Sequence, residues 1–166
     1  MSRLLGLDLG DHRIGVAVAD LATGAIRPLT TLRRGALAAD AARLARLAAE
    51  QDATELVVGL PLDMQGGEGE QAGKTRTWAA EMTARTGLRL GWRDERLTTA
   101  AAESRQPALH RHRETGRPTR SSILARRARV DQEAAVLILR AELDVRGTAQ
   151  GDRSRVDLPD TGPAAG

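Results

Sequence analysis

The stretch Arg3-Leu4-Leu5-Gly6-Leu7-Asp8-Leu9-Gly10 decides the fold that we expect for this chain. Residues 3–9 are almost all apolar, as in a strand that is buried on both faces of a sheet. A turn over residues 10–13 follows, and apolar runs over residues 14–19 and 26–32 predict two further strands. Because the connections between these segments are short, we expect an antiparallel meander.

Beyond this meander, helical and strand-like segments alternate along the chain. Apolar residues at helical spacing predict helices over residues 36–51 and 70–86. Short apolar runs predict strands over residues 56–60 and 88–92. Strand–helix connections of this kind add parallel strands to a sheet. The sequence therefore predicts an α/β fold with a mixed five-stranded sheet, three antiparallel strands followed by parallel strands, flanked by helices.

The last part of the chain changes composition twice. We expect a helix to begin over residues 98–105. The prolines and the glycine that follow predict a loop in the middle of a basic segment. Residues 131–146 form a strong helical pattern with an apolar centre. Later residues lack periodicity and are rich in Gly, Pro, Asp and Thr. We therefore expect one domain over residues 1–146 and a disordered tail over residues 147–166.

The composition fits a single globular domain, since the chain has 166 residues, 41% of them apolar and 28% charged. There is no cysteine, which excludes disulfide scaffolds, thiolate metal sites and cysteine nucleophiles. No apolar run is long enough to cross a membrane, and the first residues lack the layout of a signal peptide. We expect a cytoplasmic protein without a membrane partner.

The positive charge is concentrated in one segment. Residues 105–129 contain eight arginines and only Glu114 as an acid, a net charge of +7, so the rest of the chain carries −4 of the total of +3. Such an excess is a candidate contact for a polyanion; the alternative is a solvated loop in an arginine-rich proteome. The chain has no Phe or Tyr, and we expect Trp78 and Trp92 in the core, so nucleic-acid binding cannot rest on stacked aromatic rings.

Three carboxylates stand at the ends of separate elements. Asp8 lies in an otherwise apolar strand, where it needs a hydrogen-bond donor, a cation or a metal. Glu95 follows the last predicted strand, where Asp94 is equally eligible on composition. Asp131 precedes the last predicted helix. The structural alternatives are a cap of the first turn for Asp8, surface ion pairs for Glu95 and a helix N-cap for Asp131.

Together the three acids indicate a metal-dependent nuclease. Mg²⁺ and Mn²⁺ prefer oxygen ligands, and two such ions can stabilise the attacking and the leaving oxygen in phosphodiester cleavage. A cluster of three carboxylates beside an arginine-rich segment fits the cleavage of a nucleic-acid backbone.

Four blocks of sequence carry a family resemblance. They are Gly6–Gly10 with Arg13–Ala17, Val58–Leu62 with its glycine-rich continuation, Asp94–Thr99, and Val130–Asp131 leading into Ala134–Leu139. In this order and spacing, over residues 3–146, they resemble the YqgF family. This family, also called RuvX, comprises Holliday-junction-resolvase-like proteins of the ribonuclease H superfamily.

The resemblance implies a ribonuclease H-like fold and a metal-binding catalytic triad of Asp8, Glu95 and Asp131. In the wider superfamily such acids hold two Mg²⁺ or Mn²⁺ ions that activate a water molecule. The family is associated with four-way DNA junctions and with the precursor of 16S ribosomal RNA near its 5′ end. We therefore expect an endonuclease that acts on one of these substrates. A junction resolvase would need a two-fold homodimer, although no sequence patch identifies an interface.

The chain departs from the family pattern in three places. Arg93 stands where an apolar strand residue is common, which leaves the facing of that strand open. Asp63 stands where we expect asparagine, which puts an amide hydrogen bond in doubt. Residues 105–121 match no block, so their role is inferred from charge alone.

Ten basic residues are candidate contacts for nucleic-acid phosphates. Arg13 could bind a phosphate through two parallel hydrogen bonds, or be a solvated hairpin residue. Lys74 begins the helix after the glycine-rich loop 66–69, which is not a Walker motif and which we expect to form a flap beside the site. The full set is Arg13, Lys74, Arg96, Arg111, Arg113, Arg117, Arg120, Arg126, Arg127 and Arg129.

Two other functions remain open from the sequence. A ribosome-assembly factor that binds RNA without cutting it would use the same basic segment. A sugar-kinase or actin-like ATPase also opens with Asp-x-Gly and a β-hairpin, but its active unit needs two such domains, and 166 residues are too few.

Overall fold

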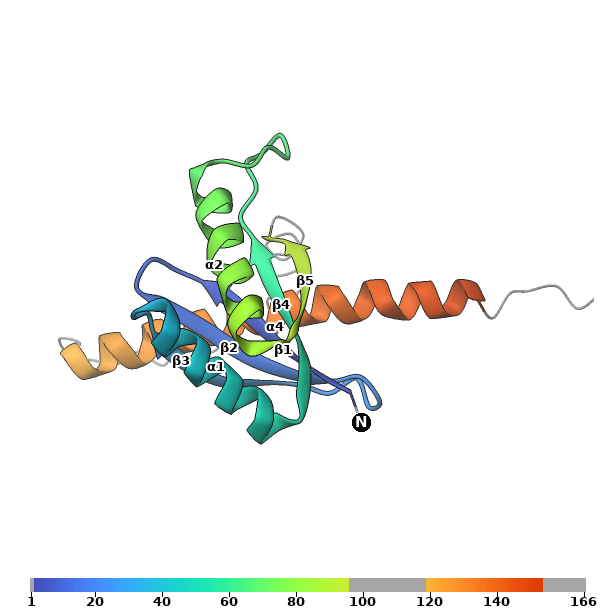
Figure 1. Ribbon diagram of the computed structural model, residues 1–166, viewed down its shortest axis with the longest axis horizontal. Coiled ribbons are helices and arrows are strands. Elements are labelled where there is room, and N and C mark those ends of the chain that lie inside the picture. Colours follow the sequence, from blue (N-terminus) through green and yellow to red (C-terminus); the bar gives the residue numbers. More distant parts are fainter. Residues whose placement is uncertain (1, 96–118, 154–166) are drawn as a thin grey trace, which may run out of the picture.

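A computed structural model defines residues 2–95 and 119–153 of the protein (Figure 1). Its sheet has five strands in the spatial order β3-β2-β1-β4-β5. The strands are β1 (Arg3–Leu9), β2 (Arg13–Asp20), β3 (Ile26–Arg33), β4 (Ala53–Leu60) and β5 (Arg89–Asp94). The first three pair antiparallel, β4 runs parallel to β1, and β5 runs parallel to β4. The predicted mixed sheet is confirmed.

Helices cover both faces of this sheet, as Figure 1 shows. One face carries α1 (Leu37–Gln51) and α2 (Glu70–Thr86), which also contact each other. The long helix α4 (Arg120–Arg153) crosses the other face and contacts all five strands. The result is three layers, helix–sheet–helix. None of the helices in the described ranges has the length and apolar character of a membrane span.

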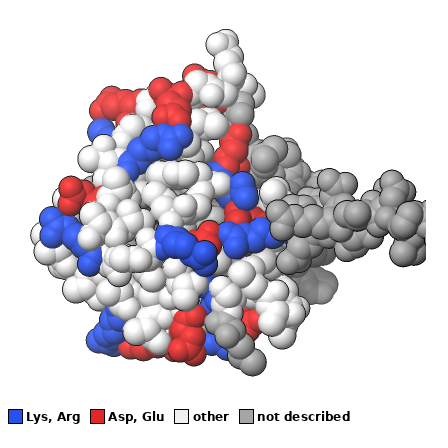
Figure 2. All heavy atoms as spheres, turned by 45° about the vertical axis from the view of Figure 1, so that its right-hand side comes forward, with Lys and Arg blue, Asp and Glu red and all other residues white. Residues whose placement is uncertain are grey.

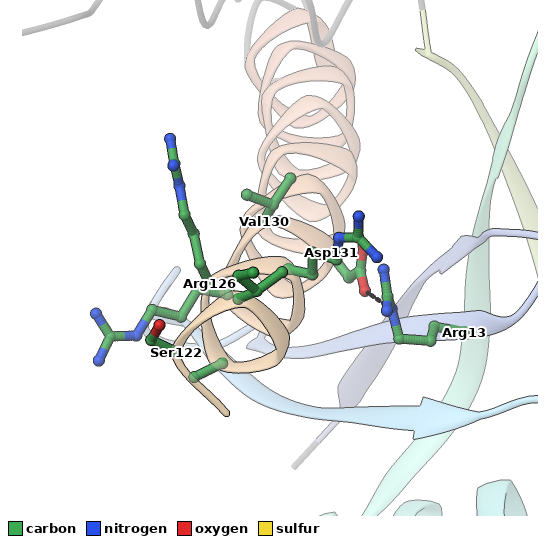
Figure 3. A pocket seen from close by; sticks show the side chains of 9 residues that line it. Arg13, Ser122, Arg126, Val130 and Asp131 are labelled. Carbon is green, nitrogen blue, oxygen red and sulfur yellow. Dashed lines mark hydrogen bonds and ion pairs between the residues drawn. The ribbon is translucent and has the colours of Figure 1, made fainter. Parts of the chain in front are cut away.

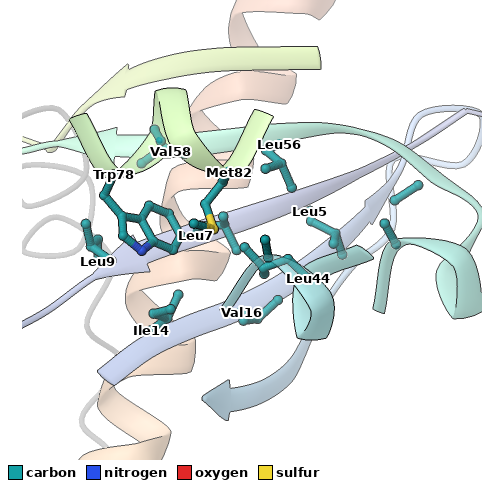
Figure 4. Packing of buried hydrophobic residues seen from close by; sticks show 14 of the residues in the cluster. Leu5, Leu7, Leu9, Ile14, Val16, Leu44, Leu56, Val58, Trp78 and Met82 are labelled. Carbon is teal, nitrogen blue, oxygen red and sulfur yellow. The ribbon is translucent and has the colours of Figure 1, made fainter. Parts of the chain in front are cut away.

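Because successive side chains of a strand point to opposite faces of the sheet, the apolar core forms two clusters, one on each face. Leu5, Leu7 and Leu9 of β1 point toward α1 and α2, where Trp78 and Met82 complete the larger cluster (Figure 4). Trp92 packs at its border, so both tryptophans belong to the core, as the sequence predicts. The smaller cluster, beneath α4, is formed by Leu4, Ala17, Ala19, Val57, Ala135, Ile138 and Leu139.

Glycines on three neighbouring strands let α4 approach the sheet closely. A Cβ atom at Gly6 of β1 would lie 2.4 Å from Cγ of Leu139. At Gly15 of β2 it would lie 1.9 Å from the backbone oxygen of Asp131, and at Gly59 of β4 it would lie 2.5 Å from Cδ1 of Ile138. A side chain at Gly6 or Gly15 would meet the backbone of α4 and push the helix away, whereas one at Gly59 would meet only side-chain atoms. Gly6 and Gly15 therefore fix how closely α4 packs on the sheet.

Helix α4 is longer than the predicted helix over residues 131–146. It begins at Arg120 and continues to Arg153, into the segment for which we expect a tail. Residues 120–127 are all exposed, and contact with the sheet starts where the Thr31 hydroxyl donates to the carbonyl of Ala128 at 2.8 Å. The sequence does not indicate these extra turns, because residues 120–130 and 147–153 carry no apolar repeat at helical spacing. The expected helix over residues 98–105 and the following loop lie outside the described residues.

An ionic cluster pins the middle of α4 to the parallel strands. Glu142 is buried and is in ion-pair contact with Arg93 of β5 and with Arg146. Arg146 also contacts Glu55 of β4. Arg93 therefore faces α4, which settles the facing of β5 that the sequence left open.

Candidate active site

Three carboxylates come together on the α4 face, at one end of the sheet. Asp8 lies one residue before the end of β1 and is paired with Gly15 on β2. The backbone of Asp131 lies directly on Gly15, so α4 brings this acid next to Asp8. Glu95 follows β5, and its Oε1 lies 2.7 Å from where a Cβ of Gly59 would stand. The absence of a side chain at Gly15 and at Gly59 therefore leaves room for two of the three acids.

The structure distinguishes Glu95 from Asp94. Side chains alternate along β5, and Arg93 contacts Glu142 on the α4 face. Glu95 is two residues further along and reaches the same face at Gly59. Asp94, which is paired with Leu60 in the sheet, lies between these two residues and therefore belongs to the opposite face. Of the two acids that composition left equal, Glu95 joins the cluster.

Burial and like charges disturb the ionisation of this cluster. Burial raises the pKa of Glu95 to about 7, with further contributions from the negative charge of Asp8, the hydrogen bond to Asp8 and the charge of Asp94. The pKa of Asp8 is also raised, first by burial and then by the charge of Asp131, while the hydrogen bond from Glu95 lowers it. Asp8 and Glu95 thus share a proton more readily than two isolated carboxyls would.

Asp131 is held by an arginine instead. Nε of Arg13, at the start of β2, donates to Oδ2 of Asp131 at 2.7 Å, and both side chains are partly exposed (Figure 3). Because α4 begins at Arg120, Asp131 lies well inside the helix. The alternative of a helix N-cap is therefore wrong. No signal in the sequence connects two residues so far apart along the chain.

The donor set suits a hard divalent cation, but its arrangement is incomplete. Three carboxylates supply the oxygen ligands that Mg²⁺ and Mn²⁺ prefer, and their mutual repulsion is the kind that a cation relieves. Within the described ranges, however, no three acidic or histidine side chains converge as ligands of one ion. Asp8 bonds to Glu95, while Asp131 bonds to Arg13.

Basic residues of α4 extend the site away from the sheet. A hollow of about 720 Å³ is lined by Arg13, Ser122, Ile123, Ala125, Arg126, Arg127, Arg129, Val130 and Asp131. Figure 3 shows Arg13 directed at Asp131, with Arg126 and Ser122 nearer the start of the helix. Four of the ten candidate phosphate contacts, Arg13 among them, therefore line one hollow that opens next to a carboxylate of the cluster.

The other predicted contacts are dispersed or undescribed. Arg120 is exposed at the first residue of α4. Lys74 is exposed on α2 and forms an ion pair with Glu70 at 2.6 Å. This contact, and to a lesser degree the charge of Asp11, raises the pKa of Lys74. Four candidates lie outside the described residues: Arg96, Arg111, Arg113 and Arg117.

The glycine-rich loop is organised by Asp63. Its Oδ1 accepts hydrogen bonds from the backbone N–H groups of Gln65 at 2.9 Å and Gly67 at 2.6 Å. These bonds need only an acceptor, so aspartate serves where we expected asparagine. At the far end of the loop, Glu68 contacts Arg76, whose guanidinium lies 4.8 Å from the centre of the Trp92 ring. The loop is therefore anchored to α2 and β5.

Comparison with known proteins finds relatives that match most of this chain. A curated protein of Rhodopseudomonas palustris (strain TIE-1), named "Putative pre-16S rRNA nuclease", is 44% identical over 145 residues, covering 85% of this chain and 82% of its own length. A protein of the same name from Anaeromyxobacter sp. (strain Fw109-5) is 44% identical over 144 residues, covering 87% of this chain and 98% of its own length.

A solved structure shares the fold. The structure described as Thermus thermophilus RuvC in complex with a Holliday junction substrate matches with a TM-score of 0.52 at 12% sequence identity, covering 89% of this chain and 96% of that one. This likeness supports the ribonuclease H-like architecture. The family profile described as "RuvX: Holliday junction resolvase" matches residues 2–145, and the chain belongs to that family.

Proposed function

We propose that this protein is a divalent-metal-dependent endonuclease that hydrolyses phosphodiester bonds of structured nucleic acid. The observation that carries the proposal is the meeting of Asp8, Glu95 and Asp131 from three separate elements, beside a hollow lined by arginines. Acids whose pKa values are raised by burial and by a neighbouring negative charge are costly to a fold and are typical of functional sites.

Asp8, Glu95 and Asp131 would hold one or two Mg²⁺ or Mn²⁺ ions, which when bound supply an activated water and neutralise charge on the phosphate. The chain's own contribution is to place these acids on rigid elements. Asp8 lies within a central strand, and Asp131 is fixed by the seat of α4 on Gly15. Arg13, Arg126, Arg127 and Arg129 would bind phosphates flanking the cleaved bond and offset their repulsion from the acids.

Of the two substrates associated with the family, we place pre-16S ribosomal RNA first. The relatives that match most of this chain at 44% identity carry that substrate in their names. The likeness to RuvC is limited to 12% identity and supports the fold alone. Either substrate would place the activity in the cytoplasm, and cleavage of a four-way junction would additionally require a homodimer.

The test is cleavage of two labelled substrates in parallel. Purified protein is incubated with Mn²⁺ or Mg²⁺ and either an RNA spanning the 5′ precursor region of 16S rRNA or a four-way DNA junction. We expect metal-dependent cleavage that Asp8→Asn abolishes, and the ratio of the two rates identifies the substrate. Glu50→Gln, on the exposed surface of α1, serves as a matched control that should cleave like the wild type.

Two results would contradict the proposal. Cleavage that survives Asp8→Asn would place the chemistry elsewhere. Tight RNA binding without cleavage under either metal would favour the non-catalytic assembly factor.

A further inference from the structure

Asp131, one acid of the cluster, forms an ion pair with Arg13 of the same chain. Nε of Arg13 contacts Oδ2 of Asp131 at 2.7 Å. Within the described part of the chain, the terminal nitrogens of Arg13 have no hydrogen-bond partner of their own. Arg13 also lines the hollow that contains the α4 arginines. One guanidinium therefore lies between a carboxylate and the expected path of a phosphate backbone.

The backbone around Arg13 is fixed, so only its side chain can exchange partners. The N–H of Gly10 donates to the carbonyl of Arg13 at 2.8 Å and closes the turn. The backbone N–H of Arg34 donates to the carbonyl of His12 at 2.9 Å. Nη1 of the same Arg34 donates to the carbonyl of Gly10 at 3.1 Å. The turn is held from two sides, which presents the guanidinium at a defined place.

The ion pair between Arg13 and Asp131 competes with two ligands, a divalent cation and a phosphate. A divalent cation that binds Asp131 must displace Arg13 or accept its positive charge at close range, and both weaken metal binding. A phosphate competes with Asp131 for the guanidinium, because an arginine fork matches phosphate oxygens as well as carboxylate oxygens. Occupation of Arg13 by a phosphate would therefore free Asp131 and remove the repulsion.

We propose that Arg13 is a positioning residue that exchanges Asp131 for a substrate phosphate and so couples nucleic-acid binding to metal binding. The idea rests on the proposed function in needing a polyanionic substrate and a divalent cation at Asp131. Because coupling between two ligands is reciprocal, nucleic acid would tighten metal binding and metal would tighten nucleic-acid binding.

The first test measures Mn²⁺ affinity by calorimetry, without nucleic acid. We expect Arg13→Gln to bind Mn²⁺ about five- to tenfold more tightly than the wild type, because a positive charge beside the ion is removed. Arg13→Lys, which keeps the charge, should stay closer to the wild type. Arg27→Gln is the matched control. Arg27 contacts Gln51 and lies near the start of β3, whereas Arg13 is paired with Arg33 at the end of that strand. This variant should leave Mn²⁺ affinity unchanged.

The second test repeats the titration in the presence of a saturating four-way DNA junction, with Mn²⁺ binding to the junction alone subtracted. The wild type should gain Mn²⁺ affinity, and Arg13→Gln should gain less. Far-UV circular dichroism and thermal unfolding check that each variant is folded. If Arg13→Gln is unfolded, Arg13→Met repeats both titrations with a neutral side chain of similar length.

The proposal is overturned if the folded neutral variant binds Mn²⁺ no more tightly than the wild type. It is also overturned if both proteins gain the same affinity from the junction. These readouts do not depend on cleavage. If Arg13 couples metal and nucleic-acid binding but neither substrate is cleaved, the proposed nuclease function is refuted and the proposal for Arg13 stands. If cleavage occurs without this coupling, the nuclease function stands and the proposal for Arg13 is refuted.

Discussion

At Glu95, burial and the nearby Asp8 raise the pKa from 4.5 to about 7. The folded protein therefore holds this proton more tightly than the unfolded chain, so stability falls as the pH rises from about 4.5 to about 7. Glu95→Gln removes the charge that the fold disfavours. We expect its Tm to exceed that of the wild type by about 2–4 °C at pH 8, with a smaller difference at pH 5. Calorimetric unfolding at both pH values measures this.

A matched control for this change is Glu81→Gln, which alters an exposed glutamate of α2 that is paired with Arg85. It should show no stabilisation at pH 8. An equal difference between Glu95→Gln and the wild type at both pH values would contradict the role of ionisation. Under the proposed function, nuclease activity should rise with pH through about 7, since the acids that would hold the metal must lose their protons first.

Individual residues of the site could be predicted to different degrees. Asp8 stands out because a carboxylate inside an apolar strand needs a partner. Glu95 could not be separated from Asp94 by composition, because the choice depends on which face of β5 lies under α4. The link between Arg13 and Asp131 could not be predicted at all, since it depends on where a helix lies across the sheet.

Among the elements, the docking of α4 depends on Gly15. A Cβ atom there would overlap the backbone oxygen of Asp131 at 1.9 Å, and backbone atoms cannot rotate away as a side chain can. We expect Gly15→Ala to lower the free energy of unfolding by about 1–3 kcal/mol. It should also reduce cleavage sharply, because Asp131 would move away from Asp8. Denaturant unfolding and the cleavage assay measure the two effects.

Gly73→Ala is the matched control for Gly15→Ala. Nothing lies within 4 Å of a Cβ at Gly73, which is in α2, so this change should be neutral or stabilise the protein by up to about 1 kcal/mol. A Gly15→Ala protein as stable and active as the wild type would refute the role of this contact.

The boundaries of the elements show what a sequence pattern can detect. The limits of α2 agree with prediction because its buried face repeats at helical spacing. The sequence pattern places the start of α4 eleven residues too late, because the residues from Arg120 to Val130 are almost entirely exposed and supply no such repeat. The glycines of β1, β2 and β4 were available in the sequence as a sign of close packing, although nothing identified the partner.

For the whole molecule, binding of nucleic acid should depend on a few arginines beside the site. On the face shown in Figure 2, basic and acidic side chains are interspersed, which favours no extended contact with a polyanion. We expect Arg126→Gln/Arg127→Gln to weaken binding and to reduce the slope of log affinity against log salt by about 1.4–1.8. Fluorescence anisotropy across a salt series, in EDTA, measures this.

The matched control for that double variant is Arg46→Gln/Arg85→Gln. It removes the same charge from exposed arginines of α1 and α2 that pair with Glu50 and Glu81. Its salt slope should equal that of the wild type. If both double variants show the same salt slope, the net charge of the protein governs binding, and the position of the arginines on α4 does not.

The position of Asp131 on α4 has a consequence for biosynthesis. Asp8 and Glu95 are translated before α4, and Asp131 reaches them only once this helix has docked on the glycines of the sheet. A nascent chain that lacks α4 therefore has an incomplete set of acids. Under the proposed function, the three acids would therefore act together only after α4 has docked on the sheet.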